Sequence, residues 1–150
     1  MKLGVIGQGF VGGAVYQGMK NYFDVYTYDI NGKCTESSLF ELIEKVNVTF
    51  LCLPTPMRKS GECDLSIVEN CLSQVDMLVK SLNKKDFIVI IKSTIPPGTT
   101  ERLNKSNENI NVFSTTKTAA ELPGFLFYKF KTQANCQKWC DLKSGRVVPK

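Results

Sequence analysis

The sequence predicts an α/β fold built on a doubly wound parallel sheet, and two observations carry that prediction. Apolar runs typical of buried strands alternate with segments of helical periodicity from residue 2 to about residue 113. A glycine-rich turn, G-x-G-x-x-G, follows the first apolar run directly. Alternation of this kind implies right-handed crossovers between parallel strands, with helices on both faces of the sheet.

The first half of this alternation is a strand, a helix, a second strand and a short helix. The run "KLGVIG" is apolar and ends in glycine, as strands buried on both faces do. Residues 11–22 are expected to form a helix, and 24–29 a second strand rich in β-formers. Ser38 and Glu41 have the spacing of a capping box, which predicts a short helix there. The first helix has these residues at helical spacing: Val11, Ala14, Val15, Gly18 and Met19.

The second half adds three more strands and two helices. "VTFLCL" is a third strand, which "PTP" ends abruptly, and Asp64 is placed to cap a long helix. "FIVIIK" is a fourth strand, a further helix opens near Thr99, and "INVF" is a fifth strand. The long helix has one continuous apolar face: Ile67, Val68, Cys71, Leu72, Val75, Leu78, Val79 and Leu82.

Length and composition are those of one globular domain. The chain has 150 residues, of which 43% are hydrophobic and 22% charged. No apolar run approaches the ~20 residues that cross a bilayer, and the first residues lack the layout of a signal peptide. We therefore expect a cytoplasmic protein with no membrane partner.

The net charge of +5 is confined to the end of the chain. Residues 1–113 hold 12 Lys and Arg against 12 Asp and Glu, whereas residues 114–150 hold 7 against 2. This basic tail has no nucleic-acid recognition motif, so no nucleic-acid partner is predicted. Six cysteines accompany no histidine, and Cys136 and Cys140 are the one close pair. Reduced thiols are therefore favoured over a metal site.

The glycine turn has the context that gives the pattern meaning, because a strand precedes it and a helix follows. Gly7 would permit the tight turn, and Gly9 would let a pyrophosphate approach the backbone. Gly12 would let the helix pack close to the strand. The start of the helix offers unpaired N–H groups and partial positive charge to phosphates. The turn thus predicts a Rossmann-like dinucleotide site.

Asp29 ends the second strand, 20 residues beyond Gly9. A carboxylate there would accept hydrogen bonds from the adenosine ribose and repel a 2′-phosphate, which favours NAD over NADP. Lys33 could soften that preference. The alternative is that the glycines serve strand–helix packing alone and that Asp29 is a solvated strand end.

Two further stretches end the third and fourth strands at the same rim of the sheet. They are "LCLPTP" at 51–56 and "KSTIPPGTT" at 92–100. Their prolines stop each strand and hold the following backbone rigid. The hydroxyls of Thr55, Ser93 and Thr94 are expected to face the cofactor cleft. The alternative is that both stretches are only rigid turns.

Together these motifs resemble the N-terminal domain of the UDP-glucose/GDP-mannose dehydrogenases. The resemblance covers residues 2 to about 113, in order and with similar spacing. It rests on G-x-G-F-V-G at 7–12, the acid at 29, L-P-T-P at 53–56, G-E-x-D at 61–64 and K-S-T-x-P-P-G-T-T at 92–100.

The resemblance implies a two-step, NAD-dependent oxidation of a nucleotide-sugar alcohol toward the acid. It implies that Thr94 helps to position a catalytic water. Full-length members can form homodimers. The cofactor-binding residues expected here are Gly7, Gly9, Phe10, Val11, Gly12, Asp29, Lys33, Leu53, Pro54, Thr55, Ser93 and Thr94.

The resemblance stops near residue 113, which predicts an NAD-binding domain at 1–113 and a divergent, irregular basic tail at 114–150. The family's proline-glutamate-phenylalanine segment is replaced by "STTKTAAELPGFLFYKF", and no cysteine has a G-x-C-x-P setting. We expect a truncated enzyme that lacks the catalytic cysteine and substrate domain, and that meets a nucleotide sugar only if a second domain is supplied. The tail is a divergent end, a packed tail or an out-of-frame translation.

Two other functions remain open at this point. One is a stand-alone dinucleotide-binding or partner-binding module, whose tail would recruit something else. The other is an NAD domain of the β-hydroxyacid dehydrogenase kind, which would give the prolines and threonine of 53–56 no role.

Overall fold

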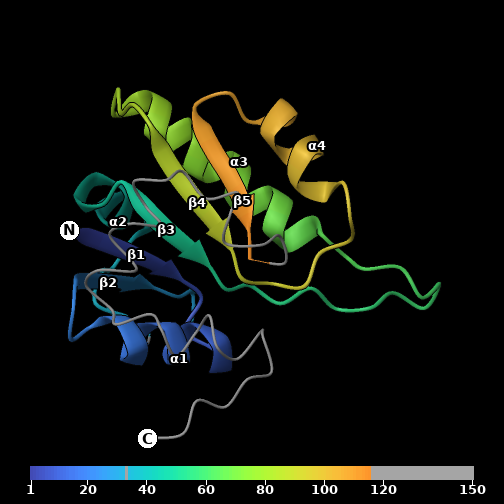
Figure 1. Ribbon diagram of the computed structural model, residues 1–150, viewed down its shortest axis with the longest axis horizontal. Helices are drawn as coiled ribbons and strands as arrows, with labels where there is room; N and C mark the ends of the chain where they lie inside the picture. Colours follow the sequence, from blue (N-terminus) through green and yellow to red (C-terminus); the bar gives the residue numbers. More distant parts are fainter. Residues whose placement is uncertain (33, 116–150) are drawn as a thin grey trace, which may run out of the picture. The chain divides into compact units, whose positions relative to one another are not determined.

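A computed structural model describes residues 1–32 and 34–115, and these form a five-stranded parallel sheet (Figure 1). The strand order is β2-β1-β3-β4-β5, so the direction of winding reverses between β1 and β3. Contacts divide the chain after Thr116, and the described residues lie in the first of the two units. The strands are β1 (Lys2–Ile6), β2 (Asp24–Tyr28), β3 (Val48–Leu51), β4 (Phe87–Ile91) and β5 (Ile110–Ser114).

Four helices connect the strands in the predicted order. Right-handed crossovers with this strand order place α1 on one face and the other three helices on the opposite face (Figure 1). The predicted α/β alternation is therefore confirmed. The helices are α1 (Phe10–Met19), α2 (Leu39–Lys45), α3 (Ser66–Ser81) and α4 (Thr99–Ser106). None of these described helices is both long and apolar enough for a bilayer crossing.

A side-chain cap fixes where α2 begins, whereas the N-cap of α3 is Leu65, which makes no side-chain cap hydrogen bond. The Ser38 hydroxyl accepts the Glu41 amide at 3.2 Å, as the capping-box spacing predicts. The Glu41 carboxylate, however, accepts from the Ser37 hydroxyl and amide, and the hydroxyl bond lowers the pKa of Glu41. Asp64 accepts the Ser66 amide at 3.0 Å at the start of α3. A 3.0 Å hydrogen bond from Arg58 holds the pKa of Asp64 well below its usual value.

The hydrophobic core cluster of the described residues lies between the sheet and helices α2, α3 and α4. The predicted apolar face of α3 is buried at Val68, Leu72, Val75 and Val79, whereas Ile67 is 42% exposed. The cluster also contains these residues of strands, helices and connections: Ile6, Leu42, Ile43, Val46, Leu51, Phe87, Val89, Ile91, Ile95, Leu103, Ile110 and Val112. All four residues of β3 are buried, as a central parallel strand requires.

Helix α1 differs from its prediction in length and in its buried face. It ends at Met19 rather than near residue 22. Val11, one of the apolar residues at helical spacing, is 45% exposed, and Gly12 is the residue of α1 that is buried. The helix therefore approaches the sheet through a position without a side chain, which periodicity of apolar residues does not reveal.

Lys84 ties two turns together at the amino-terminal rim of the sheet. Its ammonium donates to the carbonyl oxygens of Glu44 and Val46, at 2.8 and 2.6 Å, and to Asn47 Oδ1 at 3.1 Å. The first two acceptors lie at the end of α2, where a cation is favourable. Desolvation lowers the pKa of Lys84.

We expect Lys84→Met to lower the free energy of unfolding by about 1–2 kcal/mol, because three acceptors lose a charged donor. Lys85→Met is the matched control, since Lys85 is exposed at the neighbouring position. Urea unfolding followed by circular dichroism measures both. Equal changes in the free energy of unfolding for Lys84→Met and Lys85→Met would show that the Lys84 hydrogen bonds do not stabilise the protein.

Candidate functional site

The carboxyl ends of four strands bring the predicted site residues to one rim of the sheet. Backbone hydrogen bonds continue the ladder one residue beyond β1, β3 and β4. They join Gly7 N–H to Tyr28, Cys52 N–H to Ile6 and Lys92 N–H to Leu51, at 2.8, 2.8 and 2.9 Å. The segments after these strands are therefore held side by side in the order β2, β1, β3, β4. Ligands of open α/β sheets bind at this rim.

Two glycines of the turn are required by packing inside the protein. Gly7 has φ +91°, and a Cβ there would lie 2.5 Å from the carbonyl oxygen of Cys52. A Cβ on Gly12 would lie 1.7 Å from the carbonyl oxygen of Gly7. Helix α1 therefore rests directly on the turn that precedes it, as predicted for Gly12.

Gly9 has no such internal reason to be glycine. Its φ of −69° suits any residue, and no described atom beyond its chain neighbours lies within 4 Å of a Cβ placed there. Gly9 precedes α1, and none of the described side chains caps the amides of the first turn. Phe10, the first residue of α1, is 96% exposed. The turn thus presents bare backbone and helix amides to open space.

Asp29 lies directly against the glycine turn. Its Oδ2 accepts the Gln8 amide at 2.6 Å, and its Oδ1 accepts the Asn31 amide at 2.8 Å. The carboxylate that ends β2 and the turn that ends β1 therefore form one unit. The sequence predicted their proximity, and the Gln8 contact is new. A carboxylate oxygen can accept more than one hydrogen bond.

A pocket of about 430 Å³ lies beside Asp29 at the connection from β2 to α2. Ile30, which is 87% exposed, gives it an apolar wall. The described residues that line it are Tyr28, Asp29, Ile30, Gly32, Cys34, Thr35, Glu36 and Ser37. Lys33, expected at this place, lies outside the described residues.

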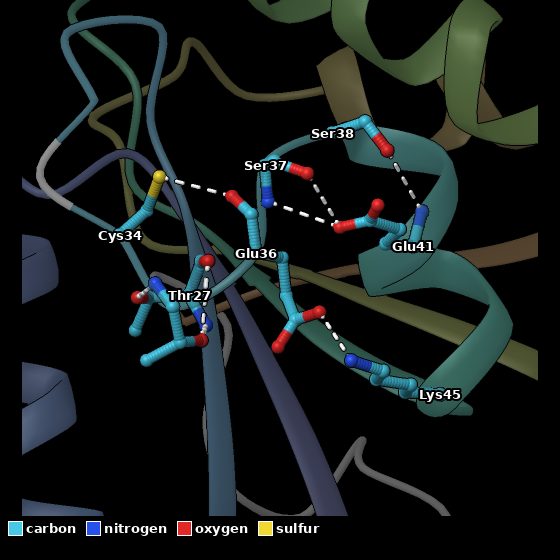
Figure 2. A network of polar contacts seen from close by, with 8 residues as sticks. Thr27, Cys34, Glu36, Ser37, Ser38, Glu41 and Lys45 are labelled. Atoms are coloured by element: carbon cyan, nitrogen blue, oxygen red, sulfur yellow. Dashed lines mark hydrogen bonds and ion pairs between the residues drawn. The ribbon is translucent and has the colours of Figure 1, made fainter.

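A network of polar contacts orders this connection (Figure 2). The Cys34 thiol donates to the Glu36 carbonyl, and the Glu36 carboxylate, 6% exposed, pairs with Lys45 at the end of α2. Thr27 and Thr35 exchange two bonds, each amide donating to the other's hydroxyl, at 2.8 and 2.9 Å. The Glu36 amide also donates to the Thr27 carbonyl at 3.1 Å. Sequence patterns did not single out Glu36, which lies between a strand and a helix with no periodicity to mark it.

The two proline-rich segments meet across the exits of β3 and β4. The Ser93 hydroxyl donates to the Leu53 carbonyl at 2.5 Å, and the Thr55 hydroxyl donates to the Thr94 carbonyl at 3.0 Å. Pro54 and Thr94 are exposed, and Thr55 and Ser93 are half-buried. Of the three hydroxyls expected to face the cleft, two thus donate within the protein.

The Cys52 thiol at the rim is expected to be weakly reactive. Its carbonyl and Cβ lie beneath Gly7 and Gly12, and burial raises the pKa of its thiol to about 11. Cys63 approaches the Thr94 carbonyl with its thiol at 3.8 Å, a contact that the sequence did not suggest. The described residues contain no group of acidic, cysteine or histidine side chains arranged for a metal. Cys136 and Cys140 lie outside the described residues.

Substitution of Gly12 by alanine should cost about 3 kcal/mol or more of stability, because the added methyl meets backbone rather than a flexible side chain. Gly13→Ala should stabilise α1 by about 0.5–1 kcal/mol, since a Cβ there meets no described atom and alanine favours helix. Thermal unfolding of both variants checks the pair. A Gly12→Ala protein as stable as the parent would show that α1 does not rest on the turn.

The thiol of Cys52 should resist alkylation at pH 8, where a pKa of about 11 leaves about one thiolate in a thousand. Its labelling rate should rise about tenfold for each pH unit up to pH 10. Iodoacetamide labelling with peptide mass mapping measures this, and Cys71, whose pKa burial also raises to about 11, should behave alike. Labelling of Cys52 at pH 8 as fast as glutathione would contradict this account.

Known proteins resemble this chain in sequence and in fold. Residues 33–126 match the model of the UDP-glucose/GDP-mannose dehydrogenase family, NAD binding domain. UDP-N-acetyl-D-mannosamine dehydrogenase of Methanocaldococcus jannaschii is 30% identical over 67% of this chain and 30% of its own length. A UDP-glucose dehydrogenase from Pyrobaculum islandicum has the same fold, with a TM-score of 0.65 at 24% identity over 75% of this chain.

A GDP-mannose dehydrogenase from Pseudomonas aeruginosa also shares the fold, with a TM-score of 0.61 at 17% identity over 76% of this chain. The chain covers 35% of each of these two solved chains, and between 18% and 30% of the curated relatives with which it aligns over at least half its length. The family match spans more than half of the 150 residues. The chain therefore belongs to the UDP-glucose/GDP-mannose dehydrogenase family, and its match is to the NAD-binding domain of that family.

Proposed function

We propose that this chain binds NAD across the rim of the sheet and serves as the dinucleotide-binding half of a nucleotide-sugar dehydrogenase. The proposal rests mainly on the surroundings of Gly9. This glycine has an ordinary φ, and the space that a side chain would occupy there is open. The packing of the described residues does not explain that glycine, whereas a pyrophosphate against the backbone does. Gly9 and Asp29 precede the range of the family match, so this support is independent of it.

The adenosine half of NAD would lie over β2 and its connection to α2. Asp29 would accept the ribose hydroxyls, because its carboxylate lies against the glycine turn, where its Oδ2 accepts the Gln8 amide at 2.6 Å. The adenine would enter the neighbouring pocket, against the exposed side chain of Ile30. A 2′-phosphate would meet the Asp29 carboxylate, which favours NAD over NADP.

The pyrophosphate would lie on the glycine turn, where it meets the start of α1. Phosphate oxygens would accept from the amides of Phe10 and Val11, because the first N–H groups of a helix have no partner within it. The first turn of α1 contains no acidic residue that would oppose this charge. Gly7 and Gly12 shape the turn, and Gly9 leaves room for the ligand.

The nicotinamide half would follow in strand order over β3 and β4. Leu53, Pro54 and Thr55 would line its path, and Ser93 and Thr94 would lie near the ring. Thr94 is exposed, and its hydroxyl makes no hydrogen bond within the part of the chain that the structure describes. This supports the proposal that Thr94 donates to a ligand or to a catalytic water.

The reaction of the complete system would be oxidation of a nucleotide sugar, in which NAD supplies the hydride acceptor. Support comes from relatives named as dehydrogenases of UDP-glucose, GDP-mannose and UDP-N-acetyl-D-mannosamine. In this proposal the described residues bind and orient the dinucleotide. The groups that bind and attack the sugar come from a second domain or chain, because catalysis needs them held in one geometry with the cofactor.

Calorimetric titration with NAD, NADP and UDP-glucose tests this proposal. We expect NAD to bind, NADP to bind more weakly, and UDP-glucose to give no heat with the chain alone. Binding of UDP-glucose without NAD would contradict it. A stand-alone partner-binding module would instead show a basic tail that a partner protects from proteolysis.

Gly9→Ala should separate binding from folding. Its methyl group meets no described atom, so the melting temperature should stay within about 2 °C of the parent. The same methyl occupies the place of the pyrophosphate, so NAD affinity should fall at least about tenfold. Gly18→Ala, where a Cβ also meets no described atom, is the control and should bind NAD as the parent does. Unchanged NAD binding by Gly9→Ala would place the cofactor elsewhere.

A further inference from the structure

The backbone ladder between β3 and β4 stops where the two proline-rich segments begin. Ile88 N–H donates to Asn47 at 3.0 Å, and Lys92 N–H donates to Leu51 at 2.9 Å, in the parallel register of the strands. Two residues further on, the same pattern would join Thr94 N–H to the Leu53 carbonyl. In the opposite direction of donation, four residues beyond Leu51, it would join Thr55 N–H to the Thr94 carbonyl. Neither backbone bond is formed among the described residues.

Side-chain hydroxyls take over those same two acceptors. Ser93 Oγ donates to the Leu53 carbonyl at 2.5 Å, and Thr55 Oγ1 donates to the Thr94 carbonyl at 3.0 Å. The bonds are reciprocal, because each segment supplies one hydroxyl and one carbonyl. The prolines at 54, 56, 96 and 97 have no N–H to donate, and the amides of Thr55 and Thr94 form no ladder bond among the described residues, so hydroxyls supply the donors that close the gap.

The joined segments are anchored to the glycine turn and to the core. The Leu53 side chain would lie 3.2 Å from a Cβ on Gly7, so the β3 exit packs against the turn. Ile95, next to Thr94, is 7% exposed and belongs to the main core cluster. The position of Thr94 relative to the turn is therefore fixed through a short chain of contacts.

We propose that the Ser93–Leu53 and Thr55–Thr94 hydrogen bonds form a clamp that sets the position of Thr94 relative to the glycine turn, with Ser93 and Thr55 as positioning residues. The proposal rests on the proposed NAD site. Both donor hydrogens are used inside the protein, so Ser93 and Thr55 can only accept from a ligand. Thr94 is then the hydroxyl of the three that can donate to one.

The strand order predicts which end of NAD should bind more weakly when the clamp is lost. The clamp lies across β3 and β4, whereas Asp29 and the glycine turn follow β2 and β1. The span from β2 to β4 is three strand spacings, roughly 14 Å. Loss of the clamp should weaken contacts at the nicotinamide end and leave those of the ADP-ribose end in place.

The test compares NAD with ADP-ribose, which lacks the nicotinamide, by calorimetry on the 150-residue chain. Ser93→Ala and Thr55→Val should each weaken NAD binding about three- to tenfold and change ADP-ribose binding less than twofold. Thr55→Ser keeps the hydroxyl and should restore NAD affinity. Ser81→Ala is the control. It removes a hydroxyl at the end of α3 that donates to the Leu78 carbonyl, and it should change neither the NAD nor the ADP-ribose affinity.

Two further measurements separate a clamp from direct contacts. Either substitution alone opens the clamp. The double variant, Ser93→Ala with Thr55→Val, should therefore lower NAD affinity by no more than about twice the factor of the stronger single variant. If the two residues made independent contacts, the factors of the single variants would multiply. Without ligand, ¹⁵N relaxation should show lower order parameters at Thr94 and Ile95 in Thr55→Val, and at Leu53 in Ser93→Ala.

The clamp is overturned if order parameters on the opposite segment stay unchanged, or if NAD and ADP-ribose affinities fall by the same factor. Multiplicative losses in the double variant would also overturn it and assign Ser93 and Thr55 to direct contacts. Failure of the parent chain to bind either ligand defeats the proposed NAD site and this inference together. Binding of both with no change in any variant defeats the clamp alone.

Discussion

The contact between Gly12 and the Gly7 carbonyl is the constraint on which the site depends. It brings the start of α1 onto the end of β1 with no side chain between them, where a methyl group would lie 1.7 Å from that oxygen. Because α1 packs against the Gly7 carbonyl, Gly9 in the middle of the turn is left facing solvent. Asp29 holds the turn from the direction of β2, where its carboxylate accepts the Gln8 amide. A packing requirement inside the protein thus produces an exposed strip of backbone amides.

Much of the fold was predictable because central parallel strands are continuous apolar runs and α3 has a regular apolar face. The runs at 48–51 and 87–91 are strands in the structure, and the Ser38 cap begins α2 as expected. The buried face of α1 was not predictable in the same way. That helix contacts β1 and β2, and its buried residue is Gly12, which the helical spacing of apolar residues does not single out.

The site was predictable in its residues and less so in its bonds. Spacing placed Asp29 beside the glycine turn, and prolines placed two segments at one rim. The direction of a hydroxyl depends on which backbone carbonyl lacks a partner, and this follows from strand register rather than from residue type. Ser93 and Thr55 therefore donate across the segments instead of into the cleft. The buried Glu36 has no pattern that would have revealed it.

Strand β2 lies at one edge of the sheet, and an open edge can recruit a strand from another molecule. Thr27, in that strand, has its amide bonded to the Thr35 hydroxyl and its carbonyl bonded to the Glu36 amide. A foreign strand would have to displace both before it could pair there. The segment that lines the pocket beside Asp29 therefore also blocks strand pairing at Thr27.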